Sequence, residues 1–131
     1  MLELTSIYLT TAILAIMIFF SFVIAPVTFT TLDEENARKF IRRIFPFYYN
    51  VNLALSLIVT LIFVILKSYN LNFYLILTVA VLFFLSNFTL MPLINKFRDE
   101  KKDKQFKYTH FLSVIINFVQ ILLLLIILIL N

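Results

Sequence analysis

The feature of this sequence best suited to chemistry is a row of uncharged polar side chains near its C-terminal end. Four of them recur at intervals of three and four residues and so share one helical face: His110, Ser113, Asn117 and Gln120. Amide and hydroxyl groups donate and accept hydrogen bonds, and histidine also changes its charge near neutral pH. The row is therefore a candidate binding surface.

The three other hydrophobic stretches add polar residues, and Ser21, Asn52, Asn87 and Asn117 reach a similar depth, about one to two helical turns inward. Two interpretations stay open. These side chains form interhelical hydrogen bonds, worth roughly 0.6 kcal/mol each, or they line a polar cavity open to the cytoplasm, with Tyr49 and His110 at its mouth. On the second interpretation the binding residues are Tyr49, Asn52, Asn87, His110, Ser113, Asn117 and Gln120.

The sequence offers little for catalysis or for metal binding. It contains one histidine, no cysteine and no glycine, and no carboxylate lies well inside a hydrophobic stretch. We therefore expect no catalytic residues, no Gly-rich phosphate loop, no cofactor and no metal site, and hence no enzyme. Met17 or Met91 beside His110 would be a non-specific Cu(I) site. The lack of charged groups inside the stretches also argues against a proton-coupled pump.

The polar rows lie within stretches long enough to cross a membrane. Hydrophobic residues make up 63% of the 131 residues, whereas about half is usual in a soluble domain. Four stretches have the roughly 20 residues that a transmembrane helix needs: 7–27, 45–66, 71–93 and 111–130. Since little chain remains, we predict one domain, residues 1–131, an all-α integral membrane protein with a four-transmembrane-helix bundle. No Lys or Arg precedes the first stretch, so we expect a retained span rather than a signal peptide.

The basic residues predict the orientation. Ten of the 11 Lys and Arg residues lie in two connecting segments, which share one side if all four stretches cross. The positive-inside rule places that side in the cytoplasm and both termini outside, and all six tyrosines lie near predicted span ends, as interfacial anchors do. We predict a bacterial inner-membrane protein whose basic residues contact anionic lipid head groups and not nucleic acid: Arg38, Lys39, Arg42 and Arg43.

The first basic segment is predicted to be helical. Thr31 and Glu34 have capping-box spacing, and apolar residues then recur at helical intervals as far as Ile44. This pattern predicts a short amphipathic helix on the inner leaflet, although a solvated connector is the alternative. The second basic segment is more uniformly charged, so we predict a solvated linker with extensions of the adjoining spans.

A weak internal repeat relates the two halves of the chain. A shift of 66 residues brings Pro26 onto Pro92 and Asp33 onto Asp99. The shift predicts two tandem helical hairpins related by a pseudo-two-fold axis along the membrane normal. The two aligned prolines should kink or end their spans, whereas Pro46 should lie in the first turn of the second span, where proline is tolerated.

Several motifs together resemble the transmembrane-protein-205-like family, whose bacterial members form domain of unknown function 4149. The motifs are Ala25-Pro26, Phe45-Pro46-Phe47-Tyr48-Tyr49, Pro92 with Arg98, and His110-x-x-Ser113-x-x-x-Asn117. The resemblance extends over nearly the whole chain and implies a four-span membrane protein of unsettled biochemical function. It also implies structural motif positions at Pro26, Phe45, Pro46, Tyr48, Pro92 and Arg98.

Eukaryotic relatives in that family are connected with tolerance of metal drugs, so the resemblance implies metal or toxicant handling. We therefore expect a small transport or tolerance factor with a polar inner-leaflet cavity, alone or as a homo-oligomer. The alternative is a structural or accessory subunit that docks on a larger membrane protein complex. A cavity that reaches Asn117 from the cytoplasmic side favours the first function, and a dry core with a flat apolar face favours the second.

Overall fold

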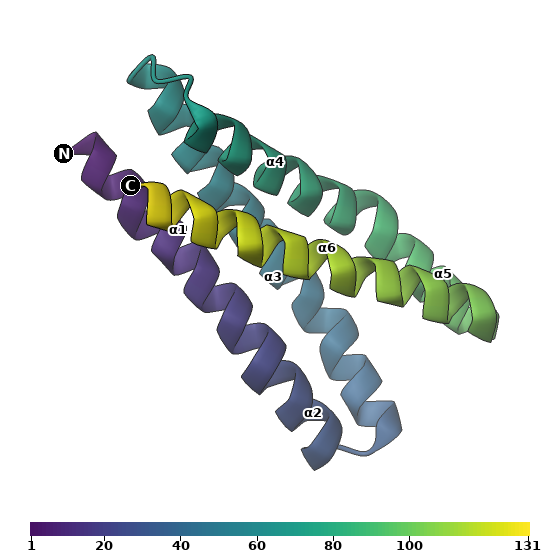
Figure 1. The fold of residues 1–131 in the computed structure, drawn as a ribbon. Helices are drawn as coiled ribbons and strands as arrows, with labels where there is room; N and C mark the ends of the chain where they lie inside the picture. The colour runs from purple at the N-terminus through teal and green to yellow at the C-terminus, as the bar shows by residue number, and fades with distance from the viewer.

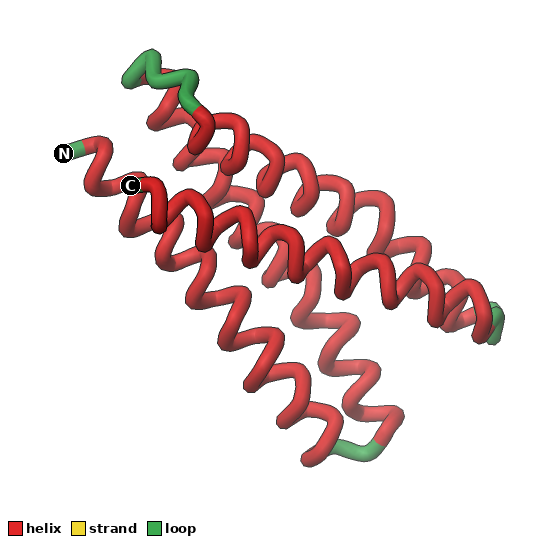
Figure 2. Tube along the Cα trace, viewed as in Figure 1, coloured by secondary structure: helices red, strands yellow, loops and turns green.

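The computed structural model describes all 131 residues, and the chain is helical apart from its ends and three short turns (Figure 2). Four continuous helical segments are long and apolar enough to cross a membrane: Leu2–Thr31, Glu34–Ile65, Leu71–Asp99 and Asp103–Leu130. Three of them contain a predicted span in full, and Glu34–Ile65 contains all of 45–66 except Leu66. The prediction of an all-α membrane bundle is confirmed, and the protein is a multi-pass membrane protein.

The first and third segments share an unusual construction, an α-helix followed by one π-helical turn and a second α-helix. They comprise α1 (Leu2–Phe19), η1 (Phe20–Ile24) and α2 (Ala25–Thr31), then α4 (Leu71–Leu85), η2 (Ser86–Leu90) and α5 (Met91–Asp99). In both, the residue before a proline donates its N–H to the carbonyl five residues earlier. Because proline lacks an N–H and crowds the carbonyl four residues before it, the wider turn accommodates it. Pro26 and Pro92 therefore do not end their helices.

The third long helix, α3 (Glu34–Ile65), includes both the first basic segment and the second predicted span. It begins where it does because the Asp33 carboxylate accepts a hydrogen bond from the backbone N–H of Asn36 and caps the helix. A hydrogen bond from the Asn36 side chain lowers the pKa of Asp33. The predicted capping box is wrong, since Thr31 is the last residue of α2.

The segment predicted to be amphipathic is helical from Glu34 onward, but it is the first part of α3 and not a separate helix. Two ion pairs on its exposed face, Arg38 with Glu34 and Lys39 with Glu35, have the spacing that stabilises a helix. Because α3 begins so early, Pro46 lies inside the helix. The prediction that Pro46 occupies a first turn is wrong.

The helices α3 and α5 end in the same kind of turn, made without glycine. In both, the residue after the C-cap has a positive φ, and its N–H and the next N–H bond back to the final carbonyls, which is a Schellman arrangement. That residue is Lys67 (φ 51°) after α3 and Lys101 (φ 54°) after α5, where glycine is usual. The predicted linker before the last span is only a short turn, because α5 reaches Asp99 and α6 (Asp103–Leu130) begins directly afterwards.

The bundle consists of two hairpins, α1–α2 with α3 and α4–α5 with α6 (Figure 1). Both termini and the α3–α4 turn lie at one end, whereas the two basic turns lie at the other end, where the hairpins diverge. Helices α1 and α4 each pack against both α3 and α6. The fully buried side chains of Ile13, Val59, Phe83 and Leu124 form part of the core between them.

The predicted repeat is also present in the local structure. The two π-helical turns, Phe20–Ile24 and Ser86–Leu90, are 66 residues apart. The second residue of each turn hydrogen-bonds to an asparagine of the other hairpin: Ser21 accepts from Asn117, and Asn87 donates to Asn50. The two halves thus share a helix construction and a type of polar contact in addition to their topology.

The tyrosines divide into two groups. Four of them are exposed near the ends of helices, as predicted for interfacial anchors: Tyr8, Tyr69, Tyr74 and Tyr108. The prediction is wrong for Tyr48 and Tyr49, which are only 5% and 8% exposed. Because α3 extends far beyond the predicted start of its span, these two side chains lie within the bundle and not at its edge.

Candidate functional site

A cleft of about 640 Å³ lies between the two hairpins, at the end of the bundle where they diverge. This volume is within the range of roughly 300–1,000 Å³ that small-molecule sites occupy. Residues from η1, α2, α3, α5 and α6 form its walls. The lining is mainly apolar and aromatic, and includes Phe20, Phe22, Phe29, Ile41, Phe45, Met91, Ile94, Val114 and Phe118.

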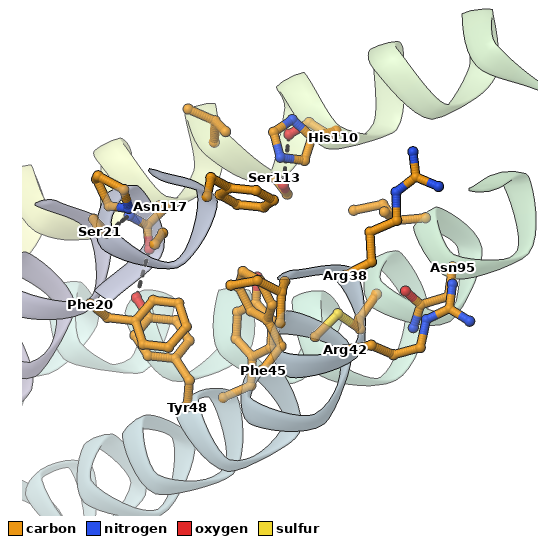
Figure 3. A pocket seen from close by; sticks show the side chains of 18 of the residues that line it. Phe20, Ser21, Arg38, Arg42, Phe45, Tyr48, Asn95, His110, Ser113 and Asn117 are labelled. Carbon is orange, nitrogen blue, oxygen red and sulfur yellow. Dashed lines mark hydrogen bonds between the residues drawn. The ribbon is translucent and has the colours of Figure 1, made fainter. Parts of the chain in front are cut away.

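The inner end of the cleft is a hydrogen-bonded group that joins three helices (Figure 3). The hydroxyl of Tyr48 on α3 donates to Asn117 Oδ1 on α6 at 2.8 Å, and Asn117 Nδ2 donates to Ser21 Oγ on η1 at 3.0 Å. The ring of Phe20 stacks on Tyr48 with centroids 4.3 Å apart, and Phe45 meets Phe20 edge-on at 5.2 Å. We call Ser21, Tyr48 and Asn117 the polar floor.

The outer end of the cleft is basic. Arg38 and Arg42 of α3 and Arg98 of α5 all line it, and Figure 3 shows Arg38 and Arg42 at the opposite end of the cleft from the polar floor. Arg42 forms two hydrogen bonds with Asp99, at 2.9 and 3.3 Å. Glu34 is shared, since it pairs with Arg38 and also lies 3.7 Å from Arg98. The pairs from Arg42 to Asp99 and from Arg98 to Glu34 connect α3 to α5 across the hairpins.

Four of the seven predicted binding residues line the cleft: Tyr49, His110, Ser113 and Asn117. The His110 ring stacks on Phe106 at 5.7 Å, and the ring of Phe106 also lies under the guanidinium of Arg98 at 4.6 Å. The Ser113 hydroxyl donates to the carbonyl of His110 in its own helix at 2.6 Å, so it holds no other helix. The cavity interpretation therefore has a structural counterpart at these four positions.

The other three predicted residues lie outside the cleft and act in packing. Asn52 is fully buried and donates to the carbonyl of Tyr48 at 2.9 Å, while its own Oδ1 has no partner. Gln120, 1% exposed, donates to the Val79 carbonyl of α4 at 3.2 Å. Asn87 donates to Asn50. Gln120 and Asn87 therefore form interhelical hydrogen bonds, as the first of the two interpretations expects.

Sequence reasoning assigned several cleft residues to other roles. Tyr48 was expected to be a structural motif position and interfacial anchor, yet its hydroxyl closes the floor. The sequence predicts lipid contact for Arg38 and Arg42 and a structural motif position for Arg98, and the structure adds that all three line the cleft. The available signal was the helical spacing of Phe45, Tyr48, Tyr49 and Asn52, which places a mixed aromatic and polar face on α3.

The groups in the cleft are suited to non-covalent binding. The side chain of His110 makes no hydrogen bond or ion pair with a carboxylate. No three His, Cys, Asp or Glu side chains lie close enough together to hold a metal ion. The cleft instead combines an extended apolar surface, a satisfied polar floor and a basic outer end.

Comparison with known proteins identifies one family. Residues 8–103 match the family described as a domain of unknown function, DUF4149. This match includes the cleft walls from η1, α2, α3 and α5, whereas His110, Ser113 and Asn117 on α6 lie beyond it. No curated protein and no solved structure matches the chain. Since the matched region covers more than half of the sequence, this protein belongs to the DUF4149 family.

Proposed function

We propose that this protein is a small membrane transport or tolerance factor whose cleft takes up a lipophilic organic molecule from the cytoplasmic leaflet. The observation that carries the proposal is the cleft itself, with about 640 Å³ of space that extends from the basic end of the bundle inward to Asn117. An aromatic and aliphatic lining with a few polar groups is typical of small-molecule sites.

The charge pattern supports a cytoplasmic location for this cleft. The basic residues that line its outer end belong to segments that the positive-inside rule assigns to the cytoplasm. We accordingly propose a bacterial inner-membrane protein with both termini outside. The exposed Lys39 and Arg43, next to the cleft arginines on α3, would contact anionic lipid head groups.

The proposal favours an organic ligand over a metal ion. The resemblance to the transmembrane-protein-205-like family brings in tolerance of metal drugs, but a metal ion would need several donor side chains at one place. Met17 is fully buried in the core and Met91 lines the cleft without a cysteine or carboxylate beside it. An apolar toxicant, with or without a metal at its centre, matches the lining better.

The accessory-subunit function is the second candidate. Many aromatic and aliphatic side chains are exposed along all four helical segments, but lipid contact requires such surfaces in any membrane protein. The exposed faces therefore do not distinguish docking on another protein, or homo-oligomer formation, from contact with lipid. We favour transport or tolerance over the accessory role because a docking subunit has no need of a cleft.

A cleft-filling substitution tests the proposal. Ser113 lines the cleft and its hydroxyl bonds only within its own helix, so Ser113→Trp fills the space without breaking a contact between helices. Val119→Trp on the lipid-exposed surface of α6 is the matched control. The purified protein is labelled with a neutral lipophilic diazirine, and the labelled peptides are mapped by mass spectrometry.

We expect the wild type and Val119→Trp to be labelled on the cleft walls of α3 and α6, and Ser113→Trp to lose that labelling. In proteoliposomes, flux of the same probe should fall only for Ser113→Trp. Equal cleft labelling in the two variants would exclude the cleft as a binding site. If Ser113→Trp abolishes the cleft labelling but leaves the flux of the probe unchanged, transport through the cleft is excluded.

A further inference from the structure

We propose that the ligand of the cleft is an anionic amphiphile with a single hydrocarbon chain and a phosphate or carboxylate head group. This inference rests on the proposed function, which requires only a lipophilic ligand, and it adds the class of that ligand. It follows from the charge at the outer end of the cleft, from the apolar space between the two ends, and from the side that no ion pair bridges.

The outer end of the cleft has more positive than negative groups. Three guanidinium groups, those of Arg38, Arg42 and Arg98, face two carboxylates, those of Glu34 and Asp99. The Arg42 fork is fully engaged by Asp99, whereas Arg38 and Arg98 share the single carboxylate of Glu34. One positive charge is therefore left without a partner, and a phosphate or carboxylate matches the planar donors of arginine.

The middle of the cleft accepts a hydrocarbon chain. Figure 3 shows the ring of Phe45 between the arginines and the polar floor, and Phe20 and Met91 also line the cleft. In the floor, Asn117 is bonded through both its oxygen and its nitrogen, and Tyr48 donates its proton to it. Because those groups are already paired, the inner end does not require a polar ligand atom.

Ion pairs bridge one side of the cleft, and none bridges the other. The pairs from Arg42 to Asp99 and from Arg98 to Glu34 join α3 to α5 on the bridged side. On the other side, Phe29 of α2 and Phe118 of α6 line the cleft and are 59% and 52% exposed. Figure 1 shows α2 and α6 diverging on this side. A lipid chain can therefore enter sideways from the bilayer while its head group stays at the basic end.

Competition against the diazirine label tests the ligand class. The competitors share one chain length and differ in the head group: dodecyl phosphate, dodecanol and dodecyltrimethylammonium. Inorganic phosphate is the fourth competitor and tests whether the head group alone suffices. The variants are Arg38→Gln and Arg98→Gln, with Arg43→Gln as the control, because Arg43 is on α3 but lines no part of the cleft.

In the wild type and in Arg43→Gln, we expect dodecyl phosphate to displace the label at a concentration about tenfold or more below that needed with dodecanol. One charge-assisted hydrogen bond provides a difference of this size. The cationic competitor should be the weakest, and inorganic phosphate alone should not displace the label. Arg38→Gln and Arg98→Gln should reduce the preference for phosphate over alcohol and leave competition by the alcohol unchanged. This ratio is measured within each variant and does not depend on the yield of folded protein.

The outcomes separate the two proposals. If dodecyl phosphate and dodecanol compete equally in the wild type, the anionic class is refuted and the lipophilic cleft remains. If the arginine variants keep the full preference for phosphate, recognition by Arg38 and Arg98 is refuted. If inorganic phosphate displaces the label as well as dodecyl phosphate does, the ligand is a soluble anion and not an amphiphile. If the label never reaches the cleft, the proposed function fails first.

Discussion

Replacing Tyr48 with phenylalanine removes one hydroxyl group from the polar floor and leaves the ring in place. The side chain is 5% exposed, and its hydroxyl donates to Asn117 Oδ1 at 2.8 Å. A hydrogen bond of this kind contributes roughly 0.5–1.5 kcal/mol net, and interhelical bonds in membranes average roughly 0.6 kcal/mol. We expect Tyr48→Phe to lower the free energy of unfolding by about 1 kcal/mol.

Replacing Asn117 with leucine has a larger expected effect. It removes both the bond from Tyr48 and the bond to Ser21, and it leaves two partly buried hydroxyl groups without their partner. The cost should be about 2 kcal/mol. In the double variant, loss of the Tyr48 hydroxyl should add almost nothing, since its acceptor is already gone. The coupling energy of the double-mutant cycle should therefore be about 1 kcal/mol.

Unfolding of the purified protein in mixed micelles by added SDS measures these differences. Tyr49→Phe is the matched control, because Tyr49 is similarly buried but makes no hydrogen bond through its hydroxyl. A Tyr48→Phe variant as stable as the Tyr49→Phe variant, or a coupling energy near zero, would show that the floor does not join the helices as argued.

Two further predictions concern the turns of the bundle. Lys67→Gly should stabilise the protein by about 1 kcal/mol in the same unfolding assay, because Lys67 has a φ of 51° that glycine adopts without strain; a loss of stability would contradict the Schellman geometry. The chain has no cysteine, so single Ser68→Cys and Lys104→Cys variants report orientation. A membrane-impermeant maleimide should label Ser68→Cys in intact cells and Lys104→Cys only after permeabilisation, and the reverse pattern would place the cleft outside.

The large-scale arrangement was predictable because it depends on signals that act over many residues. Hydrophobic length determines where a helix can cross a bilayer, and each predicted span, apart from Leu66, lies within one observed helical segment. The face that carries His110, Ser113 and Asn117 was predictable for the same reason, since helical periodicity alone places these residues together. The number of helices and one wall of the site follow from such patterns.

The details that failed depend on single competing contacts. The start of α3 is decided by whether Thr31 or Asp33 caps it, and both are good capping residues. Pro46 lies inside the helix and Tyr48 inside the bundle because the predicted amphipathic helix and the second span form one continuous helix. The pairing of Arg42 with Asp99 joins residues 57 positions apart, so nothing local in the sequence indicates it.

The internal repeat explains why ion pairs bridge only one side of the cleft. Under the shift of 66 residues, the side of the cleft between α3 and α5 corresponds to the side between α6 and α2. The positions equivalent to Arg42 and Asp99, whose side chains form an ion pair, are Tyr108 and Asp33. A tyrosine cannot form the ion pair, so nothing equivalent draws α2 and α6 together. Both halves contain a π-helical turn followed by a proline, but only one interface between them has the ion pairs. The two hairpins are thus alike in helix construction and different in their charges, and in the proposed function this difference would leave the side between α2 and α6 for entry from the membrane.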